Sequence, residues 1–151
     1  MIQKKSQSNE SRGNTVPPPL PYSERLLLIE DHDDLAEATA EFLTEVGLEV
    51  RIAKSGKDAL QVAIMFRPNI VLCDMILPDM LGMEVAGALR RHPVTAGSLL
   101  IMHTAMSDIE LTILEREMTI GEFNLFLSKP MTHEKIDRLW TALAAMRRST
   151  Q

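Results

Sequence analysis

The chain has 151 residues, of which 45% are hydrophobic, and this is enough to build the core of one domain. Only 4% of the residues are aromatic and the net charge is -5, so the composition disfavours direct binding to nucleic acid. The apolar runs are far shorter than the roughly 20 residues that cross a bilayer, and no secretory signal is recognised, which predicts a cytoplasmic protein with no membrane partner. A lone Cys73 excludes an internal disulfide.

Residues 1–24 are expected to form a proline-rich arm. They contain Ser, Asn, Gln and Gly and the run Val16–Pro21, with no hydrophobic period of a strand or a helix. Such arms sometimes bind SH3-like grooves, but a linker is the commoner meaning, and we interpret the arm as a disordered linker. The folded domain is predicted at residues 25–148, with a tail at 149–151.

Short apolar runs alternate with segments of helical period from Arg25 onward. Glycine and proline mark helix ends, and a serine followed three residues later by an acid is the capping box that begins a helix. Two such boxes are present, at Ser55–Asp58 and Ser107–Glu110. In chain order, the predicted elements are a strand at 26–29, a helix at 33–46, a strand at 50–53, a helix at 56–66, a strand at 70–73, a helix at 82–92, a strand at 99–103, a helix from 108 to about 120, a strand at 123–127 and a helix at 132–148 with Trp140 on its buried side.

Strands that are apolar on both faces and separated by helices indicate a parallel sheet covered on both sides. The predicted fold is therefore a doubly wound α/β domain with a five-stranded parallel sheet. In such sheets, ligands bind at the carboxyl ends of the strands, near the point where the strand order reverses. In a flavodoxin-like strand order, 2-1-3-4-5, the first and third strands are neighbours.

Polar side chains follow four of the five predicted strands. Glu30 and Asp31 follow the first strand, Asp74 the third, Thr104 the fourth and Lys129 the fifth. Each of these taken singly also fits a helix cap or a turn, and only their coincidence at one sheet edge predicts a pocket. Carboxylates that lie close together need neutralisation, and an open, all-oxygen site suits Mg²⁺, which could also clamp a phosphoryl group.

This combination resembles the receiver domain of bacterial two-component response regulators, over roughly residues 25–148. The pair Glu30-Asp31, the stretch Asp74–Gly82, the pair Thr104-Ala105 and the pair Lys129-Pro130 match the family pattern in order and in strand placement. The resemblance implies that Asp74 is the phosphoacceptor. The other implied roles are Mg²⁺ binding by Asp31, Asp74 and the backbone carbonyl of Ile76, with Glu30 acting on the metal through water, phosphoryl contacts by Thr104 and Lys129, and a switch aromatic at Phe126.

The resemblance also implies a function. The domain would take a phosphoryl group from a histidine kinase or a histidine phosphotransfer protein, and it would be no enzyme beyond its own phosphotransfer and autodephosphorylation. Phosphorylation would draw Thr104 inward and let Phe126 turn from exposed to buried. This would change the face formed by the fourth helix, the fifth strand and the fifth helix, where a homodimer or a downstream protein target is expected to bind.

The chain ends soon after its last helix, so we expect output through a partner. It could be a stand-alone regulator or the carboxyl-terminal receiver of a hybrid kinase. Two features depart from the family pattern: Glu30 stands where Asp is more usual, and residues 121–125 do not align cleanly, which predicts an unusual segment before the fifth strand.

Other functions fit the residues less well. A haloacid-dehalogenase-like phosphatase would need a second Asp two residues after the first, where this chain has Ile76. No glycine-rich nucleotide loop is present in the sequence. The alternative that stays open is a receiver-like interaction adaptor that is not phosphorylated.

Overall fold

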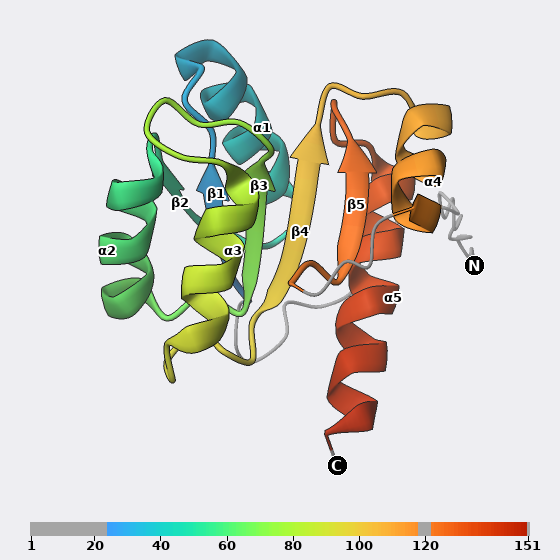
Figure 1. The fold of residues 1–151 in the computed structure, drawn as a ribbon. Coiled ribbons are helices and arrows are strands. Elements are labelled where there is room, and N and C mark those ends of the chain that lie inside the picture. Colours follow the sequence, from blue (N-terminus) through green and yellow to red (C-terminus); the bar gives the residue numbers. More distant parts are fainter. Residues whose placement is uncertain (1–23, 118–121, 151) are drawn as a thin grey trace, which may run out of the picture.

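Five parallel strands form one sheet in the order β2-β1-β3-β4-β5 in the computed structural model, which describes residues 24–117 and 122–150. Strands and helices alternate along the chain, as predicted (Figure 1). The strands are β1 (Arg25–Ile29), β2 (Glu49–Ala53), β3 (Ile70–Asp74), β4 (Leu99–Thr104) and β5 (Leu125–Ser128). The helices are α1 (Asp33–Glu45), α2 (Gly56–Phe66), α3 (Gly82–Arg91), α4 (Asp108–Glu117) and α5 (His133–Ser149).

Each face of the sheet is covered by helices, which explains why the strands are apolar on both faces. On one face, strand residues such as Leu27 and Val71 form a core cluster with side chains of α2, α3 and α4. On the other face, Leu26 and Ile70 form a second cluster with side chains of α1 and α5. Figure 1 shows α2 and α3 in front of the sheet and α5 behind β5. The predicted doubly wound fold and its strand order are confirmed.

The capping signals differ in how completely they form. At α4 the box is reciprocal: Glu110 N–H donates to Ser107 Oγ at 3.2 Å, and Ser107 N–H donates to Glu110 Oε2 at 3.2 Å. At α2, Ser55 Oγ accepts from Asp58 N–H at 3.1 Å, and no return bond is present among the described residues. The carboxylate of Asp79, in the loop after β3, caps the N–H groups of Gly56 and Lys57 at the start of α2.

The last strand begins later than predicted. Strand β5 runs from Leu125 to Ser128 and not over 123–127, although Asn124 N–H already donates to the carbonyl of Leu100 at 2.8 Å. Phe123 is buried in the core, and Asn124 Oδ1 accepts from Leu100 N–H at 2.8 Å and from Arg90 Nη2 at 2.5 Å. The predicted end of the preceding helix near residue 120 lies outside the described residues.

The folded region extends past the predicted bounds of 25–148 at both ends, with Glu24 before β1 and Ser149 as the last residue of α5. Glu24, placed in the arm by the sequence, is 8% exposed, and its carboxylate pairs with Arg147 at 2.6 Å. Its backbone carbonyl also accepts from Glu49 N–H at 2.9 Å, which extends the contact with β2. Trp140 is half-buried against the second core cluster, so it is less enclosed than expected.

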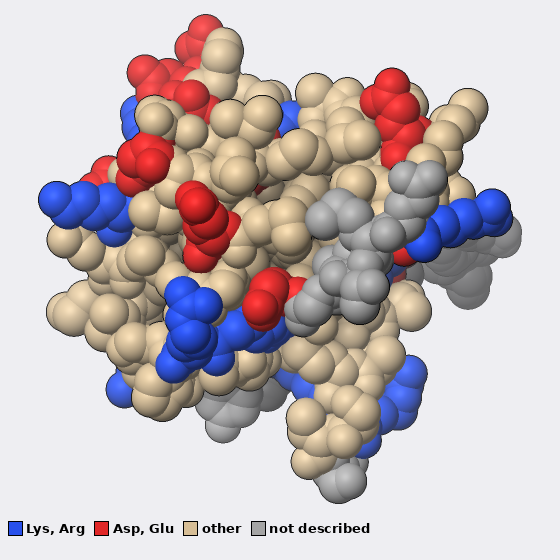
Figure 2. Space-filling view, in the orientation of Figure 1, with Lys and Arg blue, Asp and Glu red and all other residues tan. Residues whose placement is uncertain are grey.

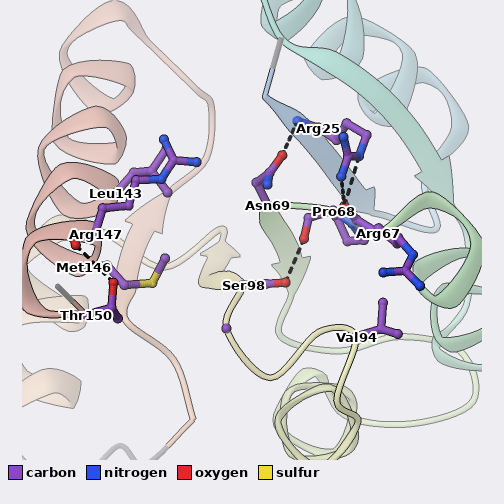
Figure 3. Close-up of a pocket in the computed structure, with 11 residues that line it drawn as sticks. Arg25, Arg67, Pro68, Asn69, Val94, Ser98, Leu143, Met146, Arg147 and Thr150 are labelled. Carbon is purple, nitrogen blue, oxygen red and sulfur yellow. Dashed lines mark hydrogen bonds between the residues drawn. The ribbon is translucent and has the colours of Figure 1, made fainter. Parts of the chain in front are cut away.

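A cavity of about 360 Å³ lies at the amino ends of the strands, away from the predicted site. Figure 3 shows its arginine-rich lining, with Arg25 directed at the backbone carbonyl of Arg67, which accepts from its Nη2 at 2.8 Å. Arg67 ends α2 with a left-handed backbone (φ 54°), and this contact helps to fix it. None of the helices within residues 24–117 and 122–150 is long and apolar enough to cross a membrane.

Candidate functional site

Three carboxylates meet at the carboxyl ends of β1 and β3. The two strands are neighbours in register, with Ile29 opposite Cys73, so Glu30, Asp31 and Asp74 emerge side by side. One carboxylate oxygen from each lies within 4.8 Å of the others. Glu30 is 3% exposed, whereas Asp31 is open to solvent. Figure 2 shows acidic side chains along the upper rim of the molecule, the end to which the strand arrows point in Figure 1.

Lys129 neutralises two of these carboxylates. Its Nζ atom lies 2.5 Å from Glu30 Oε1 and 3.1 Å from Asp74 Oδ2. Burial acts to lower the pKa of Lys129, but the hydrogen bonds and charges of Glu30 and Asp74 outweigh it and raise the pKa above its ordinary value. The lysine is therefore a fixed positive charge beside Asp74.

Backbone contacts set the position of Lys129 relative to β4. Its N–H donates to the carbonyl of Thr104 at 2.7 Å, which extends the pairing of β4 and β5 by one step beyond Thr104 and Ser128. The Lys129-Pro130 peptide is cis. From the end of β5, the Lys129 side chain reaches Asp74 at the end of β3 and Glu30 at the end of β1.

The loop after β3 folds back tightly on Asp74. Gly82 N–H donates to the carbonyl of Met75 at 2.7 Å, and Leu77 N–H donates to the carbonyl of Met80 at 3.0 Å. A Cβ atom on Gly82 would lie 2.2 Å from the backbone oxygen of Asp74, so only glycine fits there. Ile76 lies within this loop, its side chain is 64% exposed, and it forms an isolated antiparallel bridge with Leu81.

The predicted signalling residues, Thr104 and Phe126, lie on β4 and β5, on the side of β3 away from β1. Thr104 is buried, and its Oγ1 accepts from Met106 N–H at 3.4 Å. Phe126 is 4% exposed, with its ring centroid 5.8 Å from that of Phe123 in an edge-to-face arrangement. The expectation that Phe126 is exposed before phosphorylation is therefore wrong for this structure, because Phe123 and the first core cluster already enclose the ring.

Sequence reasoning missed several residues around the site. Asp79 accepts two backbone hydrogen bonds at the start of α2, and Ser128 Oγ donates to Asp108 Oδ1 at 2.6 Å. Cys73 is buried beside Asp74, and burial, with the charges of Asp74 and Glu30, raises the pKa of its thiol. His103, beside Asp74 on β4, is buried without a hydrogen-bond partner for Nε2 among the described residues. Of these, Asp79 lay in the stretch Asp74–Gly82 of the family pattern and Asp108 lay in the predicted capping box Ser107–Glu110, but no contact of either side chain was predicted.

The donor set fits Mg²⁺. All three side chains offer carboxylate oxygens, which hard divalent cations prefer, and the exposed Asp31 leaves room for the waters that Mg²⁺ usually keeps. Among the described residues, this is the group of carboxylates placed to share an ion. The structure brings Glu30, Asp31, Asp74 and Lys129 together, as the sequence predicted, with Thr104 on the adjoining strand end.

Comparisons with known proteins agree with this arrangement. A family model described as the response regulator receiver domain matches residues 26–140. A response regulator receiver protein of Anaeromyxobacter sp. is 39% identical over 87 residues, covering 57% of this chain and 37% of that protein. The DNA-binding response regulator MtrA of Mycolicibacterium smegmatis is 30% identical over 107 residues, covering 71% of this chain and 46% of that protein. The chain thus spans less than half the length of these two relatives.

Solved structures show the same fold. A Chloroflexus aurantiacus protein assigned as a response regulator is 35% identical, with a TM-score of 0.70 over 82% of this chain and 99% of that one. The chemotaxis response regulator CheY4 of Vibrio cholerae is 22% identical, with a TM-score of 0.68 over 81% of this chain and 99% of that one, and it supports the fold alone.

Proposed function

Because the chain belongs to the family of response regulator receiver domains, we propose that it accepts a phosphoryl group on Asp74 from a histidine kinase or a histidine phosphotransfer protein. The observation that carries the proposal is the geometry around Asp74. One oxygen of its carboxylate contacts the Lys129 ammonium at 3.1 Å, and Glu30 and Asp31 lie on the adjoining strand end. A nucleophile, a fixed positive charge and oxygen ligands for a cation are thereby gathered at one edge of the sheet.

In the proposed reaction, a carboxylate oxygen of Asp74 attacks the phosphorus of a phosphohistidine. The new O–P bond forms as the N–P bond breaks, and the histidine nitrogen leaves with the bonding electrons. Asp31, Asp74 and the backbone carbonyl of Ile76 would hold Mg²⁺, with Glu30 acting through water. The chemistry that Mg²⁺ supplies when bound is neutralisation of charge on the transferring oxygens.

Lys129 and Thr104 have separate roles in this proposal. Lys129 carries its positive charge where the phosphoryl oxygens would lie, and its raised pKa keeps it protonated at neutral pH. Thr104 is one strand position beyond His103, the residue opposite Asp74, and this placement at the adjoining strand end supports a role in which its hydroxyl turns toward a phosphoryl group. That turn would replace the contact from Met106 N–H and move the loop between β4 and α4.

The signal would leave through the face formed by α4, β5 and α5. Of the side chains described in α4, only Leu111 is buried, and Ile109 and Ile113 are 75% and 51% exposed. A loosely packed helix with exposed apolar side chains moves at low cost and offers a surface for a protein. We propose that a downstream protein, or a second copy of the chain, binds here after Thr104 turns and the loop between β4 and α4 moves.

The domain is proposed to be a phosphoacceptor for signalling and not an enzyme that acts on a separate substrate. Direct binding to nucleic acid is not part of the proposal, because the net charge is -5. A cytoplasmic location stays a prediction from the sequence.

The test is phosphorylation by acetyl phosphate, followed by intact mass spectrometry. Wild-type protein should gain one phosphoryl group in the presence of Mg²⁺ and none after chelation with EDTA. Asp74→Asn should gain none, whereas Asp33→Asn, which removes an exposed acid near the site, should behave like wild type. Full labelling of Asp74→Asn, or of wild type without Mg²⁺, would overturn the proposal.

A further inference from the structure

The carboxylate of Asp79 joins the loop after β3 to the amino end of α2. Its Oδ1 accepts from Gly56 N–H at 2.8 Å and its Oδ2 accepts from Lys57 N–H at 2.9 Å. These two N–H groups belong to the first turn of α2, where no intrahelical acceptor exists. The two backbone hydrogen bonds hold the pKa of Asp79 below its ordinary value. We call this pair of bonds the Asp79 clamp.

A second contact presses the same loop onto the same helix end. A Cβ atom on Gly56 would lie 2.4 Å from Cγ and 2.5 Å from Sδ of Met80, so the Met80 side chain fills the space that glycine leaves open. Gly56 is buried although it begins the helix. The clamp and the Met80 contact therefore fix the outer part of the loop against α2.

The inner part of the loop is fixed against Asp74. Gly82 packs on the backbone oxygen of Asp74, and its N–H donates to the carbonyl of Met75 at 2.7 Å. Ile76 lies between the inner and outer attachments, and its exposed side chain contributes little to holding it. The position of its backbone carbonyl consequently depends on both ends of the loop.

We infer that Asp79 is a positioning residue for the metal site: it holds the loop so that the Ile76 carbonyl and Asp74 face the same ion. This inference rests on the proposed function, because the carbonyl matters only if the loop supplies a metal ligand. Asp79 itself points its carboxylate at α2, so it acts through the loop and is not a ligand. Residues that orient metal ligands commonly change metal affinity by tenfold or more when they are replaced.

The test compares Asp79→Ala, Asp79→Asn and the matched control Asp58→Asn by calorimetric titration with Mg²⁺. Asp58 is also an exposed acid in the first turn of α2, but its carboxylate makes no hydrogen bond or ion pair with the loop among the described residues. The control therefore removes a charge at the same helix end without breaking the clamp. Asp79→Ala should weaken Mg²⁺ binding roughly tenfold. Asp79→Asn keeps one acceptor oxygen and should lie between Ala and wild type, and Asp58→Asn should match wild type.

A second measurement, on the metal-free proteins, separates this inference from the proposed function. Amide hydrogen exchange of Leu77 and Gly82 reports the two backbone bonds inside the loop. Both amides should exchange faster in Asp79→Ala, while amides of β1 and β3 keep their protection. Wild-type Mg²⁺ affinity in Asp79→Ala, or unchanged exchange at both loop amides, would overturn the role of Asp79. A wild-type protein that bound no Mg²⁺ would overturn the proposed function, and the exchange data would then decide whether Asp79 holds the loop.

Discussion

The Nζ atom of Lys129 lies 2.5 Å from Oε1 of Glu30, although the two residues are 99 positions apart in the sequence. Their side chains are 14% and 4% exposed, so the pair is largely shielded from water. Glu30 Oε2 also accepts from His32 N–H at 3.2 Å. The longer arm of Glu, compared with Asp, thus reaches across to the lysine, and this buried pair links the end of β5 to the end of β1.

Loss of the lysine charge should destabilise the fold. Lys129→Met keeps an apolar side chain of similar length but leaves Glu30 buried and unpaired beside Asp74. Removing one partner of a buried ion pair costs about 3 kcal/mol, so we expect a drop of that size in the free energy of unfolding. Urea denaturation at pH 7 measures it. The double variant Glu30→Gln/Lys129→Met should recover part of the loss, and a Lys129→Met protein as stable as wild type would contradict the burial argument.

A side chain at position 82 should disturb both stability and the site. The Cβ of Gly82→Ala would meet the backbone oxygen of Asp74 at 2.2 Å, and backbone atoms cannot move aside as a flexible side chain can. We expect a loss of about 2 kcal/mol in stability and slower phosphorylation of Asp74. The control is Gly97→Ala, where a Cβ would meet nothing within 4 Å. Equal stability of the two variants would show that the loop relaxes freely.

The sequence predicted the sheet and the site residues because both depend on local patterns. Buried strands such as Ile70–Asp74 are continuous apolar runs, and the sheet topology then brings their carboxyl ends to one edge. Contacts between distant side chains carry no local signal. The sequence placed Glu30 and Lys129 in one pocket but did not predict their direct ion pair, and it did not predict the capping of α2 by Asp79, because the partner of each side chain lies far from it in sequence.

The predicted start of the last strand, at residue 123 and not at Leu125, was wrong for the same reason: contacts between distant side chains leave no local signal in the sequence. Phe123 and Asn124 were predicted to begin the strand. In the structure the Phe123 side chain packs in the first core cluster, and Asn124 Oδ1 accepts a hydrogen bond from Arg90. Arg90 also donates to the carbonyls of Glu122, at 3.1 Å, and of Ser98, at 2.6 Å. Asn124 N–H still donates to the carbonyl of Leu100 in β4 at 2.8 Å, but the contacts of Arg90 hold residues 122–124 outside the regular strand. The sequence does not indicate which arginine makes these contacts.

The hydrogen bond between Ser128 and Asp108 should anchor α4. Among the described residues, only Leu111 of this helix has a buried side chain, so packing stabilises the helix little. The hydrogen bond at its amino end should therefore contribute a large share of what holds the helix in place. Loss of a hydrogen bond to a carboxylate costs about 1.5 kcal/mol, so Ser128→Ala should speed amide exchange within α4 roughly tenfold. Thr112→Ala is the control, because Thr112 Oγ1 donates to the carbonyl of Asp108 within the same helix. Equal exchange in the two variants would place the anchor elsewhere.

His103 should make the fold sensitive to acid. Burial lowers the pKa of His103 to about 3 in the folded chain, against an ordinary value of 6.5. Between these values the unfolded chain binds more protons, so stability falls as the pH falls. From pH 7 to pH 5 this residue should cost about 2 kcal/mol. His103→Leu fills the same space without a titratable group. Between pH 7 and pH 5, measured by urea denaturation, its free energy of unfolding should fall by about 2 kcal/mol less than that of wild type. An equal loss of stability in wild type and His103→Leu between pH 7 and pH 5 would show that burial does not lower the pKa of His103.

The identity of the phosphorylated residue is the most direct test of the proposed phosphoacceptor function. Wild-type protein labelled with acetyl phosphate and Mg²⁺ is treated with hydroxylamine, which converts an acyl phosphate to a hydroxamate, and the modified residue is located by peptide mass spectrometry. We predict a hydroxamate at Asp74 and at no other acid. A hydroxamate at Asp31, Glu30 or another carboxylate, or phosphate that resists hydroxylamine, would contradict the assignment of Asp74 as the phosphoacceptor.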